Sequence, residues 1–241
     1  MKLLIDAGNT RLKAALLADN GRIEPVLIGT LEDFIVHPWG QVDSVWLSAV
    51  AASDIVAALL GHLRQCGFTV ERVSSEKHAF GVTNAYENPT TLGVDRWLAM
   101  VAAHNENSKH TLIVDAGTAT TLDWLDASGQ HLGGWIVPGV ALMQSTLMQQ
   151  SKLISVDEAQ VGRVGQLGHN TSECVTDGCV NSLNGLVKQA IAVAETQLDW
   201  TDFRLLLTGG AYPLFAQELK RRGEERPDLV LEGLARYANG L

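Results

Sequence analysis

The most regular feature of the chain is an apolar run that occurs twice with the same ending. Leu3–Asp6 is followed by Ala7-Gly8, and Leu112–Asp115 is followed by Ala116-Gly117. Apolar runs of this length are typical of buried strands. In each copy an acid ends the run and a glycine follows, so that the backbone can approach a ligand closely. The repeat predicts two similar domains, each with a polar turn at the end of its first strand.

Apolar stretches separated by turn residues predict the other elements. In the first half, strands are expected at 2–6, 12–18, 23–29 and 44–50, and a helix is expected to begin near Ser53. In the second half, strands are expected at 111–115, 119–125, 131–137, 203–207 and 228–231, with helices at 177–198 and 213–222. Three strands followed by alternating strands and helices indicate an α/β fold with mixed sheets flanked by helices.

The polar stretch Asn105–Lys109 is the best candidate for a linker between the two halves. Polar segments between periodic apolar ones are typical of connections between structural units. We therefore expect an N-terminal domain over 1–108 and a C-terminal domain over 109–241.

The overall composition is that of a folded protein with an acidic surface. Of 241 residues, 46% are hydrophobic and 19% charged, which is enough for a well-filled core. The formal net charge is −9 and basic residues form no large cluster, so nucleic acid is not an expected partner. Three cysteines without a CxxC pair, no signal-peptide pattern and no apolar run of membrane-spanning length predict a cytoplasmic protein without a membrane segment.

The segment Asp6–Lys13 carries the groups that a phosphate-binding turn needs. Gly8 removes side-chain bulk, and Asn9, Thr10 and free backbone N–H groups can donate to phosphate oxygens. Lys13 can neutralise a phosphate, whereas Asp6 would act through Mg²⁺ and its waters. An ordinary hairpin with Asn and Gly as turn formers explains this segment equally well.

The segment Asp115–Thr121 repeats this chemistry without a lysine, since Thr118, Thr120 and Thr121 supply hydroxyl groups. A simple turn followed by a Thr-rich strand is the alternative, because Thr favours strands. The presence of both copies favours two phosphate-binding turns facing each other across a cleft, which is typical of a phosphotransferase.

A third polar segment lies near the end of the first half. Gly93 precedes a predicted helix start, which places Asp95 in the first helical turn with Arg96 beside it. A carboxylate close to a substrate hydroxyl can act as a general base, and an arginine can hold a substrate carboxylate in a bidentate fork. The alternative is an acid favoured by the helix dipole, followed by a surface arginine.

Two glycine-rich segments follow predicted strands. Gly209-Gly210 would let an adenine or ribose lie flat against the backbone, although a strand-to-helix turn is the simpler explanation. Gly133–Gly139 is better explained as a tight connection between a strand and a helix that lines the cleft.

In order and spacing, these segments resemble the type III pantothenate kinases, the CoaX-like branch of the acetate and sugar kinase/heat-shock 70/actin superfamily. The resemblance extends from Asp6 to Gly210. Asp6–Lys13 and Asp115–Thr118 are similar to the two phosphate motifs of the family, and Gly133–Gly139 is similar to a further family pattern. Tyr86 with Gly93–Arg96 is similar to its pantothenate motif, and Gly168–Thr171 resembles the segment that gives a threonine to pantothenate.

This resemblance implies two ribonuclease-H-like domains of the duplicated actin-like type, a homodimer, and ATP-dependent phosphorylation of pantothenate to 4'-phosphopantothenate, the first step of coenzyme A biosynthesis. It implies that Asp95 is the base on the substrate's primary hydroxyl and that Thr171 reaches a pantothenate held largely by the other subunit. It also implies a monovalent cation, K⁺ or NH₄⁺, at Asp115. The implied pantothenate-binding residues are Tyr86, Gly93, Val94, Asp95, Arg96 and Thr171. The implied residues for ATP with Mg²⁺ are Asp6, Ala7, Gly8, Asn9, Thr10, Arg11, Leu12, Lys13 and Thr118.

Three other classes of protein remain open at this point. A metal-dependent nuclease on the same fold would use Asp6, Asp95 and Asp115, but the acidic surface and the phosphate-suited turns argue against it. A non-catalytic transcriptional accessory factor is the second, although the presence of Asp95, Arg96 and Lys13 together favours chemistry. An actin-like polymer is the third, and it would sediment with ATP whereas a dimeric kinase would not.

Overall fold

The computed structural model describes residues 1–240 apart from 41, 152, 158 and 159, and the chain divides into two compact units. Unit 1 comprises Met1–Ser108, Ser128–His131 and Asp228–Leu241, and unit 2 comprises Lys109–Ala127 and Leu132–Pro227. The expected C-terminal domain of 109–241 therefore differs from unit 2 at its end. The reason is that helix α7 (Leu229–Asn239) packs on helix α3 (Val94–Glu106) of unit 1.

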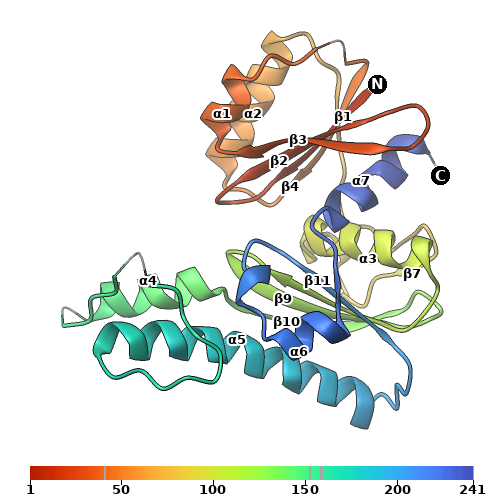
Figure 1. Cartoon of the computed structure of the whole chain (residues 1–241). Coiled ribbons are helices and arrows are strands. Elements are labelled where there is room, and N and C mark those ends of the chain that lie inside the picture. Colours follow the sequence, from red (N-terminus) through yellow and green to blue (C-terminus); the bar gives the residue numbers. More distant parts are fainter. Residues whose placement is uncertain (41, 152, 158–159, 241) are drawn as a thin grey trace. The chain divides into compact units, whose positions relative to one another are not determined.

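Unit 1 is built on a five-stranded sheet in the order β3-β2-β1-β4-β5 (Figure 1). Its strands are β1 (Lys2–Ala7), β2 (Leu12–Leu17), β3 (Ile23–Gly29), β4 (Ser44–Ala49) and β5 (Val70–Arg72). β2 is antiparallel to β1 and β3, whereas β4 is parallel to β1 and β5. The central strand β1 buries Leu3, Leu4 and Ile5 completely, as expected of an uninterrupted apolar run.

Helices cover both faces of this sheet. On one face, α1 (Leu31–Val36) and α2 (Ser53–Gln65) bury Phe34 and Leu59 against the strands. On the other face lie α7 and α3, and the ammonium of Lys2 donates a hydrogen bond to the Ala238 carbonyl of α7. Because side chains alternate along a strand, Asp6 shares a face of β1 with Lys2. Short strands β6 (His78–Ala79) and β7 (Val82–Thr83) and the 3₁₀ turn η1 (Pro89–Thr91) precede α3.

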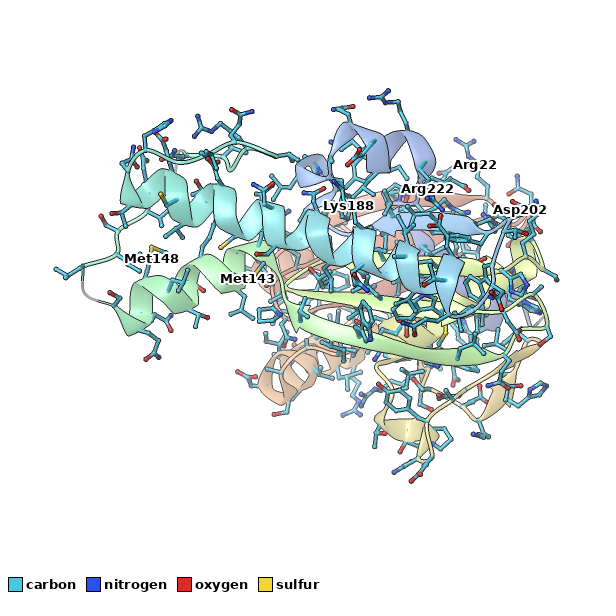
Figure 2. All side chains as sticks on the ribbon, turned by 90° about the horizontal axis from the view of Figure 1, so that it is seen from below. Arg22, Met143, Met148, Lys188, Asp202 and Arg222 are labelled. Atoms are coloured by element: carbon cyan, nitrogen blue, oxygen red, sulfur yellow. The ribbon has the colours of Figure 1, made fainter. Side chains whose placement is uncertain are left out.

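Unit 2 repeats this plan with a sheet in the order β10-β9-β8-β11-β12. Its strands are β8 (Thr111–Ala116), β9 (Ala119–Leu125), β10 (His131–Pro138), β11 (Arg204–Thr208) and β12 (Glu224–Glu225). Its helices are α4 (Val140–Gln150), α5 (Thr171–Thr196) and α6 (Gln217–Arg222), with the 3₁₀ turn η2 (Tyr212–Leu214). The long helix α5 buries Val180, Leu183 and Val187 in the core, and α4 lies alongside it (Figures 1 and 2). The common strand order confirms the predicted duplication.

Eight of the nine predicted strands match strands of the structure, whereas the short strands β5, β6, β7 and β12 were not predicted. The strand predicted at 228–231 is wrong, because α7 begins at Leu229 and buries its apolar side at helical spacing. An apolar run this short does not distinguish the periodicity of a helix from that of a strand. The long helix begins at Thr171 rather than 177, since the Asn170 side chain caps it by accepting a hydrogen bond from the Glu173 backbone. No helix within the described residues is both long and apolar enough to span a bilayer.

Candidate active site

The first glycine turn follows β1 and places Asp6 between two polar partners. In the sheet, Asp6 is in register with Lys13 on β2 and with Ser48 on β4. The hydroxyl of Ser48, which is 0% exposed, donates a 3.1 Å hydrogen bond to Oδ1 of Asp6. The backbone N–H of Gly8 donates to the carbonyl of Arg11 at 3.1 Å and closes the turn. A carboxylate and an ammonium therefore end up on neighbouring strands beside a glycine turn.

The predicted ATP-binding residues of this turn fall into two groups. Asn9, Thr10 and Arg11 are exposed, so their side chains are accessible to a ligand. Ala7 and Leu12 are buried in the core of unit 1, which leaves only their backbone groups for binding. The Nδ2 of Asn9 donates to the Val50 carbonyl at 3.4 Å and links the turn to the end of β4.

The second turn follows β8 and has the same position in unit 2. Asp115 is in register with Thr121 on β9 and with Thr208 on β11, so Thr121 takes the place that Lys13 has in unit 1. The backbone N–H of Gly139 donates to the Thr118 carbonyl at 2.9 Å, which ties the end of β10 to the turn.

Gly209 packs closely against this second turn. Its φ is +94°, and a β-carbon there would lie 2.5 Å from the Ala116 carbonyl oxygen and 2.5 Å from Oδ1 of Asp115. The Ala211 backbone N–H donates to the same Ala116 carbonyl at 2.9 Å. Both the conformation and the space therefore require glycine at 209. The two glycine-rich segments singled out in the sequence thus meet at one turn of unit 2.

Gly93 and Asp95 form the start of α3 in unit 1, as the sequence predicted. Gly93 is the N-cap residue, and Oδ1 of Asp95 accepts a 2.8 Å hydrogen bond from the Arg96 backbone N–H. A β-carbon on Gly93 would lie 2.5 Å from that same oxygen. Glycine therefore leaves room for the Asp95 side chain at the helix N-terminus, a position where acidic residues are common. Val94 is buried and offers only its backbone.

Arg96 is buried rather than exposed, so the alternative of a surface arginine is wrong. Only 5% of the residue is exposed, and Nη1 donates a 2.9 Å hydrogen bond to the hydroxyl of Tyr86. The guanidinium carbon lies 5.7 Å from the centroid of the Tyr86 ring. A buried guanidinium is costly unless it is paired, and a planar fork of donors is suited to holding an anionic group.

Thr171 lies in unit 2, whereas Tyr86 and the Gly93–Arg96 segment lie in unit 1. It is the first residue of α5 and is exposed. The segment before it is held to α5 by Asp177, which is 2% exposed and accepts hydrogen bonds from the backbone N–H of Arg163 at 2.6 Å and from its Nη2 at 2.8 Å. These hydrogen bonds, first from the side chain of Arg163 and then from its backbone, hold the pKa of Asp177 below its ordinary value.

The comparisons with known proteins agree with these motifs. A family model for type III pantothenate kinase matches residues 2–193. A type III pantothenate kinase of Azoarcus sp. (strain BH72) is 36% identical over 241 residues, covering 98% of this chain and 89% of the relative. The chain belongs to the type III pantothenate kinase family.

Two solved structures share the fold of this pantothenate kinase family member at low identity. A Campylobacter jejuni protein described as a Baf family transcriptional activator has a TM-score of 0.65 at 20% identity, covering 99% of this chain and 98% of that chain. A Sinorhizobium meliloti protein described as a 2-dehydro-3-deoxygalactonokinase has a TM-score of 0.63 at 12% identity, covering 100% and 97%. Both support the duplicated α/β fold predicted from the sequence.

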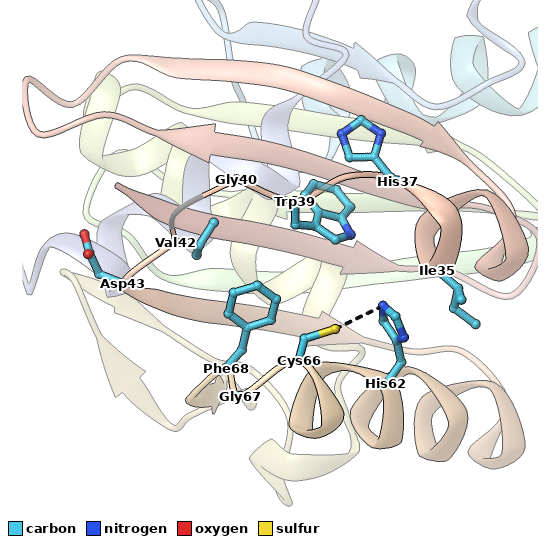
Figure 3. A pocket seen from close by; sticks show the side chains of 10 residues that line it. All are labelled: Ile35, His37, Trp39, Gly40, Val42, Asp43, His62, Cys66, Gly67 and Phe68. Carbon is cyan, nitrogen blue, oxygen red and sulfur yellow. Dashed lines mark hydrogen bonds between the residues drawn. The ribbon is translucent and has the colours of Figure 1, made fainter.

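A surface pocket in unit 1 lies away from the family motifs. Its lining includes Trp39, His62, Cys66 and Phe68, and the Cys66 thiol is 3.6 Å from Nε2 of His62 (Figure 3). The pocket also includes Asp43, which contacts the N-terminal residue at the start of β1. Since Asp6 lies at the other end of that strand, the pocket does not contain the motif residues.

Sequence reasoning missed the residues that the motif residues contact across strands. Ser48 is the clearest case, because it is the parallel-strand neighbour of the motif residue Asp6. The signal in the sequence is a hydroxyl residue near the end of the parallel strand next to the acid-bearing strand. Strand order is needed to read that signal.

Proposed function

We propose that this protein transfers the γ-phosphoryl group of ATP to the primary hydroxyl of pantothenate, giving 4'-phosphopantothenate, the first step of coenzyme A biosynthesis. The observation that carries the proposal is the buried Arg96 held by Tyr86 beside Asp95, in a chain that belongs to the pantothenate kinase family. The relatives give no support to a nuclease or to an accessory factor, since the likeness to the Campylobacter jejuni protein concerns the fold alone.

In this proposal the α3 segment binds pantothenate. Arg96 holds the substrate carboxylate in a bidentate fork, and Tyr86 fixes the guanidinium. Asp95 accepts the proton of the primary hydroxyl as its oxygen bonds to phosphorus and the bond from phosphorus to ADP breaks. Gly93 and Val94 contribute backbone groups, and Thr171 contributes its hydroxyl.

The two glycine turns bind the phosphates of ATP. Gly8, Asn9, Thr10 and the second turn at Thr118 provide N–H and hydroxyl donors, while Lys13 offsets negative charge. Phosphoryl transfer requires mainly positioning and charge compensation, and these groups supply both.

The donor set suits the metal ions that the family implies. Mg²⁺ is commonly held by one or two carboxylates together with substrate phosphates, and Asp6 would supply such a carboxylate. Asp115 has the equivalent position in unit 2 and would bind K⁺ or NH₄⁺. Bound Mg²⁺ would compensate the charge that develops on the phosphate oxygens.

The active form would be a homodimer in the cytoplasm. Helix α4 and the segment after it expose apolar side chains that a monomer would leave in water, and Figure 2 shows one of them, Met148, on this helix. These exposed residues are Leu142, Leu147, Met148, Leu153, Val161, Val164 and Leu167. Covering this surface with a second copy would bring together α5 helices that carry Thr171.

The test is a coupled assay of ADP release with ATP, Mg²⁺ and pantothenate, run in K⁺ and in Na⁺ alone. We expect turnover that depends on pantothenate and on K⁺. Folded protein that shows no turnover in either salt would refute the kinase assignment. Equal turnover in both salts would refute only the cation assignment at Asp115.

A further inference from the structure

Tyr86 is held at its backbone by two residues outside the family motif. Asn84 is 0% exposed, and its Oδ1 accepts a 2.9 Å hydrogen bond from the Tyr86 backbone N–H. The Nδ2 of Asn84 donates to the carbonyls of Glu76 and Pro89 at 3.2 and 3.3 Å. Lys77 donates from Nζ to the Tyr86 carbonyl at 3.3 Å. These contacts fix the main chain but leave the direction of the phenol ring undetermined.

The ring of Tyr86 has a second partner on a distant segment. The imidazole of His131 stacks on it with 6.2 Å between centroids and 18° between planes. His131 is the first residue of β10 and the last of Ser128–His131, a short part of unit 1, and it is 1% exposed. Its Nδ1 accepts a 3.5 Å hydrogen bond from the Ala85 backbone N–H. A buried imidazole thus supports both the ring and the preceding peptide.

The other end of Tyr86 meets the buried arginine. Its hydroxyl accepts the 2.9 Å hydrogen bond from Nη1 of Arg96. A guanidinium holds a carboxylate well only when its plane is fixed, and a tyrosine ring turns about two side-chain bonds. The hydroxyl can therefore orient Arg96 only if the Tyr86 ring is itself kept from rotating.

We propose that His131 is a positioning residue for substrate binding, which holds the Tyr86 ring so that its hydroxyl orients the Arg96 guanidinium. The proposal rests on the proposed function, in which Arg96 binds the carboxylate of pantothenate. It adds a residue from outside the family motifs and assigns it an effect on pantothenate binding, with no effect on ATP binding.

Two substitutions separate the stacking of His131 on Tyr86 from its hydrogen bond with Ala85. His131→Phe keeps a stacking ring but removes the acceptor for Ala85, and His131→Asn keeps an acceptor but removes the ring. By analogy with residues that orient metal ligands, we expect His131→Asn to raise the KM for pantothenate about tenfold. The kcat and the KM for ATP should stay close to wild type, because the contacts lie at the pantothenate motif.

His110→Asn is the matched control for His131→Asn. His110 stacks on Trp200 at 4.7 Å between centroids, and its Nδ1 accepts a 3.2 Å hydrogen bond from the Ala127 backbone N–H. All three residues belong to unit 2, whereas Tyr86 belongs to unit 1. It repeats the chemistry of the His131 site without Tyr86. A rise in the KM for pantothenate in His110→Asn equal to that in His131→Asn would overturn the proposal.

A double-mutant cycle tests the route through Tyr86. If His131 acts by holding the tyrosine hydroxyl, His131→Asn should change the KM much less in a Tyr86→Phe background. Full additivity of the two substitutions would contradict the proposal, as would parallel rises in the KM values of both substrates.

A crystal structure of the His131→Asn variant gives a readout that does not depend on activity. We expect the Tyr86 ring to rotate away from Arg96, and an unmoved ring with its hydrogen bond intact would overturn the proposal. Failure of the proposed function is distinguishable, because wild-type protein would then lack pantothenate-dependent turnover while the ring would still move in the variant.

Discussion

Gly209 lies so close to Asp115 that a β-carbon on it would be 2.5 Å from Oδ1 of the aspartate. Asp115 lies on β8, and Gly209 directly follows β11, the neighbouring parallel strand. Thr208, the last residue of β11, is in register with Asp115. In the sequence, Gly209-Gly210 was most simply explained as a strand-to-helix turn. The contact places this glycine pair beside the second phosphate motif. It means that the shape of the Asp115 turn depends on a residue far away in the sequence.

Gly209→Ala should lower both stability and ATP affinity. The β-carbon would clash with Asp115 and Ala116, and a φ of +94° strains any residue other than glycine, so we expect a loss of about 1–3 kcal/mol in unfolding free energy. Thermal unfolding and the KM for ATP measure the two effects. Gly210→Ala is the control, because nothing lies within 4 Å of a β-carbon there. Equal behaviour of the two variants would contradict the close-contact argument.

Asp95→Asn should lower kcat while leaving ATP binding nearly unchanged. The amide keeps the size of the side chain but accepts no proton, and loss of a general base lowers turnover at least ~100-fold. Steady-state kinetics with both substrates would show this. Asp54, an acid in the first turn of α2, provides the control variant Asp54→Asn. Wild-type turnover in Asp95→Asn would remove Asp95 from the proposed role.

Arg96→Lys should raise the KM for pantothenate much more than the KM for ATP. Lysine keeps the charge but loses the planar fork, and losing one charge-assisted hydrogen bond of about 1.5–3 kcal/mol corresponds to a rise of roughly 10- to 100-fold. Arg64→Lys, at an exposed position in α2, is the matched control. If both KM values rose together, Arg96 would have a general structural role instead.

Mixing two inactive variants should restore activity if the site is shared between subunits. In a dimer of Asp95→Asn with Thr171→Ala, one of the two sites combines an intact Asp95 from one subunit with an intact Thr171 from the other. Random exchange makes half of the dimers mixed, so about a quarter of wild-type activity is expected. The measurement is turnover after co-refolding of the two variants. Activity no higher than that of either variant alone would show that each site uses one subunit only.

The contact between Asp177 and Arg163 should make stability depend on pH. Hydrogen bonds from Arg163 lower the pKa of Asp177 below its ordinary value of 3.8. The stabilisation is therefore complete above that value and is lost as the pH falls through the lower pKa of the folded state. Thermal unfolding of wild type and Asp177→Asn should differ at pH 7 and converge in acid.

Arg163→Gln is the background that controls this experiment. The glutamine removes the guanidinium but keeps the backbone N–H of residue 163, which also donates to Asp177. Asp177→Asn should therefore change the unfolding temperature less, and with a weaker pH dependence, than it does with Arg163 present. A pH-dependent difference as large as that with Arg163 present would show that another group sets the pKa of Asp177.

The strand predictions that the structure confirms succeeded because the apolar pattern of those strands is visible in the sequence. Apolar runs such as Leu112–Val114 are buried on both faces, so burial and sequence pattern coincide. The helix at 229–239 was missed because its first residues form a short apolar run that suits a strand as well as a helix. Packing on α3 selects the helical conformation. The same packing assigns the C-terminal segment to unit 1.

The sequence by itself determined the duplication, the two glycine turns and the order of the family motifs. Each motif is a short continuous segment, so its residues and its place in the chain can be read without knowing the fold. The tertiary structure decided which distant residues meet them. Ser48 reaches Asp6, and Gly209 meets Asp115, through pairing of parallel strands that a long crossover separates in the chain. His131 reaches Tyr86 through stacking, which leaves no pattern in a single sequence. Local periodicity fixes elements, but contacts between elements depend on how the backbone brings them together.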